Sequence, residues 1–188
     1  MKRPLMVLSL ALCAAILTTA VACKSGGMEG DGIKDGMMQM PFGGPDDMEK
    51  AESLWGRMAD YRDWKSPSGL EGFQEGKSPH GKFIRYYLNS TARSNPSAPG
   101  AIIVKENYMA KMSDSLGAIT VMEKVPGYDM DNKDWFWVKF DPKGSVMKNS
   151  KKMSLAGRVA KGMSKGCIAC HSNAGGDDYL FVNDGPQL

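Results

Sequence analysis

The chain is 188 residues long and carries 24 lysines and arginines against 21 aspartates and glutamates, which gives a formal net charge of +3. This near balance, with no run of basic residues, argues against a nucleic-acid-binding protein. The length suffices for one domain with one hydrophobic core, and no repeat with a solenoid period is present.

The N-terminal segment 1–22 has the pattern of an export signal. Lys2 and Arg3 precede an almost purely apolar run that ends in small residues, as at a processing site. Cys23 follows directly, which is typical of bacterial lipoproteins, although Ala20 stands where such signals usually carry leucine. Ordinary cleavage and a membrane anchor are the alternatives, and a run of about 19 residues is marginal for a span. We therefore expect a periplasmic lipoprotein, anchored to the membrane by lipid on Cys23.

A flexible tether is predicted over 23–44, a segment rich in glycine and poor in large apolar residues other than methionine. Four methionines gather in it, namely Met28, Met37, Met38 and Met40. Thioethers are soft ligands that bind copper(I), so a copper site is one interpretation of this cluster. A linker whose methionines make local apolar contacts is the simpler one. The folded domain is predicted over 45–188.

A helix is predicted to begin at Pro45, where proline and two acidic residues open an amphipathic stretch. Apolar side chains recur every three or four residues from Ala51 to Ala59, so the helix presents one apolar face and is expected to end near Tyr61. A long connection rich in serine, proline and glycine follows over 65–81.

Four runs rich in β-branched and aromatic residues predict strands over 83–88, 101–106, 118–124 and 135–140. The connections between them are mostly too short for a crossover helix, so the strands are expected to be mainly antiparallel. A tight turn at 141–144, a short strand over 145–148 and a short helix over 155–165 complete the pattern. Grouped strands with helices at both ends predict an α+β fold, a mainly antiparallel β-sheet with flanking helices.

Near the C-terminus stands Cys167-Ile168-Ala169-Cys170-His171, the Cys-x-x-Cys-His pattern by which c-type haem is attached. Two thiols add to the haem vinyl groups, and the adjoining imidazole, here His171, ligates the iron. A zinc half-site would need a second ligand pair, for which only His80 is left. A dithiol redox pair would need a βαβ context that is not predicted. Cys13 lies inside the apolar run and would be removed with it, and Cys23 would carry the lipid, so each of the four cysteines is accounted for. The folded part is therefore predicted to be a single haem domain.

Four further segments precede this motif in a specific order. They are Ser78-Pro79-His80-Gly81 with Phe83-Ile84-Arg85, then Gly100-Ala101-Ile102-Ile103-Val104-Lys105-Glu106, then Asp134-Trp135-Phe136-Trp137. Together with the late Cys-x-x-Cys-His, this ordered set resembles the cytochrome P-460 family over about 64–182. The resemblance implies a mostly antiparallel sheet with flanking helices, one covalent haem c per chain, and commonly a homodimer.

In that family a lysine side chain is bonded covalently to the haem, and the distal iron position is open. The matching residue is Lys105, so the resemblance implies that Lys105 is linked to the haem. By itself, a lysine in a strand is more simply a solvated or cross-strand charge. Members of the family oxidise hydroxylamine and handle nitric oxide, whereas a sister branch without the cross-link binds small gases under an apolar cap.

The same resemblance places an arginine near the distal pocket, where Arg85 matches and would hold a bound anion or shield the site. A surface arginine on the sheet is the alternative. His80 is an alternative sixth ligand, although Pro79 and Gly81 predict a turn there and the family does not use this position so. A methionine could also ligate the iron.

One departure from the family bears on activity. Hydroxylamine-oxidising members carry a carboxylate shortly after the haem histidine, whereas Asn173 stands there in this chain. An amide hydrogen-bonds but does not act as a base near neutral pH. Asp177 and Asp178 lie close behind and are candidate substitutes.

The sequence therefore predicts an exported mono-haem c-type cytochrome that oxidises hydroxylamine or nitric oxide at an open distal site and passes electrons to a soluble partner. A protein that binds or scavenges nitric oxide or another diatomic gas without turnover, and a simple periplasmic electron carrier, are the alternatives. Cys167, Cys170, His171 and Lys105 are the predicted cofactor-binding residues. Arg85 and Asn173 are the residues expected beside the reaction.

Overall fold

The computed structural model describes residues 41–181, so the predicted export signal and nearly all of the predicted tether lie outside the described residues. The elements in chain order are α1 (Pro45–Arg57), β1 (Gln74–Glu75), β2 (Phe83–Leu88), α2 (Ser90–Ser94), β3 (Ile102–Tyr108), β4 (Leu116–Lys124), β5 (Trp135–Phe140), β6 (Ala156–Gly157) and α3 (Cys167–His171). Short 3₁₀ helices span Tyr61–Asp63, Ser113–Ser115, Met130–Asn132 and Gly175–Asp177. Within residues 41–181, no helix combines the length and the apolar character that crossing a membrane requires.

The six strands form one sheet in which each strand pairs with its neighbours in sequence, in the order β1 to β6. Every pairing is antiparallel. The predicted α+β fold with a mainly antiparallel sheet is confirmed. The register sets Lys105 on β3 opposite Tyr86 on β2 and Thr120 on β4, so the middle of the sheet carries the predicted haem-linked lysine.

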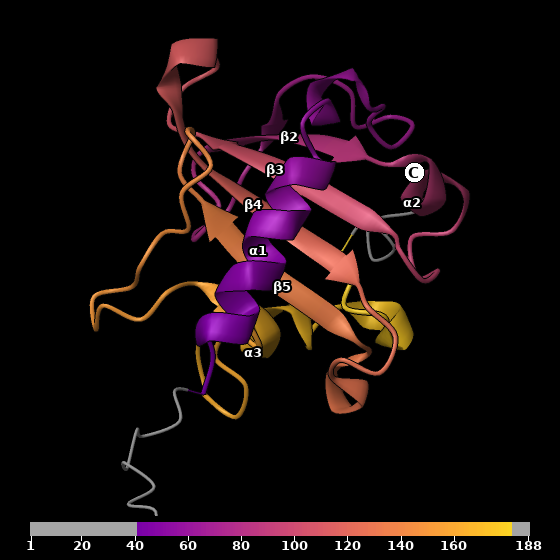
Figure 1. The fold of residues 1–188 in the computed structure, drawn as a ribbon. Coiled ribbons are helices and arrows are strands. Elements are labelled where there is room, and N and C mark those ends of the chain that lie inside the picture. Colours follow the sequence, from indigo (N-terminus) through magenta and orange to yellow (C-terminus); the bar gives the residue numbers. More distant parts are fainter. Residues whose placement is uncertain (1–40, 182–188) are drawn as a thin grey trace, which may run out of the picture. The chain divides into compact units, whose positions relative to one another are not determined.

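Strand alternation gives the sheet two differently covered faces. Helix α1 lies across one face, where its Leu54 belongs to the same core cluster as Val104 of β3 (Figure 1). On the other face Ile103 shares a core cluster with Ile168 of α3. Phe42 joins this second cluster and is 3% exposed, so packing begins inside the segment predicted as a tether.

The prediction of a helix over 155–165 is wrong. Ala156 and Gly157 form strand β6 instead, next to β5. Gly157, Ala160 and Gly162 have φ angles of 93°, 64° and 71°, and a positive φ interrupts a right-handed helix. The apolar residues that suggested a helix pack in irregular structure, since Val159 and Ala160 are both core residues.

The strand predicted over 145–148 is reduced to isolated bridges, between Val146 and Phe140 and between Lys148 and Ser154. The first helix is shorter than predicted: α1 ends at Arg57, and Tyr61 opens a 3₁₀ turn. The bend directs Tyr61 into the core, where it is 4% exposed.

A buried carboxylate ties α1 and its following turn to the sheet. Glu106 of β3 has no exposed surface and accepts hydrogen bonds from the hydroxyl groups of Tyr61 (2.6 Å), Tyr87 (2.9 Å) and Tyr108 (2.5 Å). Arg62 Nε donates to the same carboxylate at 2.9 Å. Burial alone would raise the pKa of Glu106, but the three tyrosine hydrogen bonds and the Arg62 charge hold that pKa below its usual value. We call Glu106 with these four partners the Glu106 cluster.

Candidate functional site

The Cys-x-x-Cys-His motif forms the short helix α3, so its spacing has a simple structural reading. Residues three apart in a helix lie on the same side, which brings Cys167 and Cys170 together. Neither forms a disulfide, and Cys167 is partly buried while Cys170 is exposed. Ile168 points into the core and is 5% exposed, so it anchors the helix. Gly166 precedes α3 with a φ of 136°, and a Cβ there would overlap the Cβ of Ala160.

His171 is buried with its ring held by one hydrogen bond. Its Nδ1 lies 2.8 Å from the carbonyl oxygen of Tyr179, which can only accept, so Nδ1 carries the proton and donates. The Nε2 atom is left with its lone pair, which is the tautomer that a metal ligand requires. Burial, reinforced by the positive charge of Lys105, lowers the pKa of His171 to about 4 and keeps the ring neutral.

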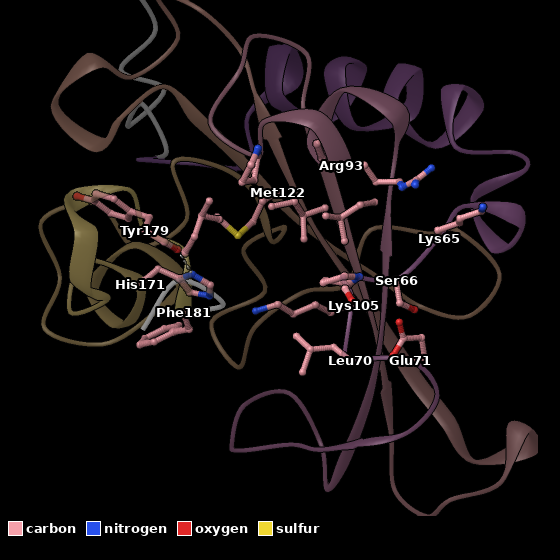
Figure 2. Close-up of a pocket in the computed structure, with 17 residues that line it drawn as sticks. Lys65, Ser66, Leu70, Glu71, Arg93, Lys105, Met122, His171, Tyr179 and Phe181 are labelled. Carbon is pink, nitrogen blue, oxygen red and sulfur yellow. Dashed lines mark hydrogen bonds between the residues drawn. The ribbon is translucent and has the colours of Figure 1, made fainter. Parts of the chain in front are cut away.

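Two cavities meet at this histidine. The first, which we call the motif cavity, has a volume of about 580 Å³ and is bordered by Cys167, Cys170, His171, Lys105 and His80. The second, the neighbouring cavity, has about 780 Å³ and runs from His171 toward Lys65 and Arg93 (Figure 2). Lys105 and His171 line both, along with Ile103 and Met122. Ligand sites in proteins have volumes of roughly 300–1,000 Å³, so either cavity is large enough for an organic cofactor.

Lys105 enters the site from the middle of β3. Its side chain extends toward His171 and Phe181 in Figure 2. Its Nζ lies 5.6 Å from the ring centroid of Tyr86, and it makes no ion pair with any described residue. Burial lowers the pKa of Lys105 to about 8, although the nearby cysteine sulfurs oppose the shift. A lysine in this position is neutral far more often than an exposed one.

His80 faces the same cavity from the loop before β2. Its ring centroid lies 6.1 Å from that of His171, with an angle of 80° between the ring planes. Its Nδ1 lies 3.2 Å from Asn107 Oδ1 and 3.2 Å from Thr120 Oγ1. Burial lowers the pKa of His80 to about 3, with the charge of Lys105 as the next contribution. The turn predicted at Pro79 and Gly81 therefore brings this histidine to the site.

The aromatic surroundings of His171 could not be identified from local sequence. Trp137 packs against the His171 ring at 4.8 Å between centroids, and Phe181 packs at 5.1 Å. Tyr179 supplies the carbonyl that orients the ring. The sequence placed Trp137 in a predicted strand, but nothing in the sequence marked Tyr179 or Phe181. Alternation along β5 does give one signal, because Trp137 shares a face with Trp135.

Strand alternation places Arg85 away from the predicted distal pocket. It lies on the α1 face of the sheet, with its guanidinium 5.4 Å from the ring of Phe73 and 5.8 Å from the ring of Tyr87. It borders neither cavity. In register Arg85 pairs with Glu106, whereas its neighbour Tyr86 pairs with Lys105. An arginine one residue out of phase with the cavity-facing positions cannot reach a ligand held there.

The residues considered as a base after the motif, Asn173, Asp177 and Asp178, are not positioned to act as one. Asn173 borders the motif cavity, but its side chain is exposed and its Nδ2 donates to the carbonyl of Ala169 at 2.8 Å. Asp177 pairs with Lys133 at 2.6 Å and is 84% exposed. Asp178 accepts from the backbone nitrogen of Leu180 at 2.8 Å. Neither aspartate borders the motif cavity or the neighbouring cavity, so the structure does not bring them to the site.

The antiparallel sheet, the short helix carrying two free thiols beside an imidazole, and the adjoining cavity together define a cytochrome-like domain. The sequence model of the family Cytochrome P-460 matches residues 58–182, which is the greater part of the chain. The chain belongs to this family of haem-binding proteins, as its motifs indicated. No curated protein matches the chain.

The residues present fit a haem. The motif cavity is bordered by two thiols, an imidazole whose Nε2 carries no proton, and a lysine that makes no ion pair with any described residue. Trp137 Nε1 is buried with no hydrogen-bond partner among the described residues, as expected for a group that faces a cofactor. The zinc alternative finds no support in residues 41–181, where no three His, Cys, Asp or Glu side chains gather in a metal-binding arrangement.

Proposed function

We propose that the chain is an exported mono-haem c-type cytochrome that oxidises hydroxylamine, nitric oxide or both in the motif cavity. The observation that carries this proposal is the lining of that cavity, which combines a metal-competent His171 with Lys105 and with His80, whose ring centroid lies 6.1 Å from that of His171. Family membership supports the haem. The open coordination position is proposed from the resemblance to the family.

Cys167 and Cys170 would bind the haem through thioether bonds, and His171 Nε2 would ligate the iron. When bound, the haem supplies one-electron redox chemistry and a coordination position for a small nitrogen compound. The protein contributes orientation: the Tyr179 carbonyl fixes the His171 ring, and Trp137 and Phe181 confine it. Such partners raise the basicity of a ligating imidazole and fix its direction.

Lys105 is proposed as the residue bonded to the macrocycle. An ammonium is not a nucleophile, so a covalent link needs the neutral amine. Burial lowers the pKa of Lys105 to about 8, so roughly a tenth of the amine is neutral at pH 7, far more than for an exposed lysine. The direction of its side chain, toward His171, agrees with such a link (Figure 2).

Gas binding without turnover is the second candidate, and the lining of the motif cavity favours it. Ile103, Met122, Val138, Leu155 and Val159 contribute apolar surface to the cavity, and an uncharged diatomic gas suits such a surface. Asn173 adds weight to this candidate, because it stands where an oxidising member carries a carboxylate and it cannot serve as a base.

Export, lipidation and partners complete the proposal. Lipid anchoring at Cys23 and a periplasmic location are supported by the sequence pattern alone, because Cys13 and Cys23 lie outside the described residues. A soluble electron-transfer partner follows from the proposed oxidation, since the electrons removed from the substrate must leave the haem. A homodimer is proposed from the family alone.

Two measurements test the proposal. A mass spectrum of the proteolytic peptide containing Cys167 and Cys170 is expected to show one attached haem and, for the cross-link, a second peptide joined through Lys105. Steady-state oxidation of hydroxylamine with an artificial electron acceptor is expected for the enzyme. Carbon monoxide that shifts the ferrous spectrum without such turnover would support the gas binder, and no shift at all would support a simple electron carrier.

A further inference from the structure

The orientation of His80 is determined by a hydrogen-bond chain that starts at the sheet backbone. Asn107 Nδ2 donates to the carbonyl oxygens of Lys105 and Ala118, each at 3.1 Å. Carbonyl oxygens only accept, so the amide orientation is fixed and Asn107 Oδ1 faces His80 as an acceptor. The proton of this contact must then be on His80 Nδ1.

Thr120 is compatible with the same assignment. Its hydroxyl lies 3.4 Å from the Lys105 carbonyl, to which it can donate its proton, and its oxygen is then free to accept from His80 Nδ1. One N–H shared by two acceptors satisfies all three groups. The opposite tautomer would set the Nδ1 lone pair against the Asn107 Oδ1 lone pairs at 3.2 Å. The sheet therefore holds His80 with Nδ1 protonated.

The consequence lies at the other ring nitrogen. His80 Nε2 carries only a lone pair, and no described residue hydrogen-bonds to it. His80 borders the motif cavity with Lys105 and His171. A fixed acceptor thus stands at the wall of this cavity, and a ligand held beside His80 Nε2 meets a hydrogen-bond acceptor there.

We infer that His80 is the specificity-determining residue of the site: its Nε2 accepts a hydrogen bond from an N–H or O–H group of the ligand, with Asn107 and Thr120 as positioning residues. Hydroxylamine offers both kinds of donor. Nitric oxide and carbon monoxide offer none and meet an opposing lone pair. This inference rests on the proposed function for the identity of the substrate class, and it makes the site selective for hydrogen-bond-donating nitrogen compounds over diatomic gases.

The test compares equilibrium binding in the holoprotein, without an oxidant. Hydroxylamine and ammonia, as donor-bearing probes, are titrated into the ferric form, and carbon monoxide into the ferrous form. In His80→Phe, loss of one hydrogen bond is expected to weaken the donor-bearing probes roughly threefold to tenfold and to leave carbon monoxide binding unchanged or tighter. Asn107→Leu keeps the imidazole but frees its tautomer, and it is expected to weaken the same probes. Arg85→Lys, on the opposite face, is the matched control and is expected to bind all probes as the natural chain does.

Three outcomes would overturn the inference. One is a parallel change for donor-bearing and donor-free probes in His80→Phe, which would mean that the ring only fills space. Another is failure of both donor-bearing probes to bind the natural chain. The last is a low-spin ferric spectrum that becomes high-spin in His80→Phe, which would make His80 an axial ligand. Failure of the proposed oxidation is seen separately, as absent turnover with an electron acceptor while the binding selectivity persists.

Discussion

The Glu106 cluster makes a quantitative prediction about the strand that carries Lys105. Glu106 has no exposed surface, and its carboxylate is the common acceptor for three tyrosine hydroxyls and Arg62. Replacing it with leucine leaves these hydroxyls buried without their acceptor. Replacing it with glutamine keeps one oxygen acceptor but removes the charge.

The magnitude follows from the number and kind of bonds lost. Each buried hydroxyl left without a partner costs roughly 1–3 kcal/mol. The Arg62 pair adds little, because that side chain is 59% exposed and solvent screens its charge. Removing the carboxylate also removes the desolvation cost of burying its charge, which offsets part of the loss. We therefore expect Glu106→Leu to lower the free energy of unfolding by about 3 kcal/mol. Glu106→Gln is expected to lower it by about 1–2 kcal/mol.

The pH dependence of this effect has a definite sign. The pKa of Glu106 is lower in the folded protein than in the unfolded chain, so its contribution to stability is fully present above the unfolded pKa of about 4.3. That contribution is lost as the pH falls through the folded pKa. The difference between the natural chain and Glu106→Gln is therefore expected to be constant above about pH 5 and to shrink in acid.

Urea unfolding of the holoprotein, followed by far-ultraviolet circular dichroism at several pH values, measures these differences. Glu52→Gln changes an exposed carboxylate on α1 and is the control, expected to stay within about 0.5 kcal/mol of the natural chain. If Glu106→Leu were as stable as this control, or if the difference grew in acid, the reasoning would be refuted.

Other predictions concern the site directly. Lys105→Arg is expected to restore an ordinary c-type haem absorption spectrum, because an arginine is not deprotonated near neutral pH; an unchanged spectrum would reject the cross-link. Gly166→Ala is expected to reduce the fraction of chains with attached haem, measured by absorbance per protein, because a Cβ there overlaps Ala160 and φ is 136°. Asn173→Asp is expected to raise hydroxylamine turnover, because it supplies a carboxylate base at the border of the motif cavity; unchanged turnover would show that this exposed side chain does not reach the site.

Local patterns were sufficient for the cofactor motif and for most of the strands. The spacing of Cys167 and Cys170 is a property of one helical turn, and neighbouring His171 needs no distant partner to be recognised. β2 and β5 have the bounds that their β-branched and aromatic runs predicted. Short connections required antiparallel pairing, because a crossover needs more chain than they contain.

The cavity, in contrast, is assembled from segments far apart in the chain, and only the tertiary structure decided which side chains meet there. His80 reaches the site because Asn107 and Thr120, on two neighbouring strands, hold its Nδ1. Arg85 is excluded because a single step along β2 reverses the face to which a side chain points, a difference that strand-like composition does not encode. The sequence by itself predicted the chemistry proposed for the chain, since covalent attachment of a haem would depend on residues that are adjacent in the motif. Tertiary structure decided the direction and protonation of the groups around it, since these depend on hydrogen bonds across the sheet.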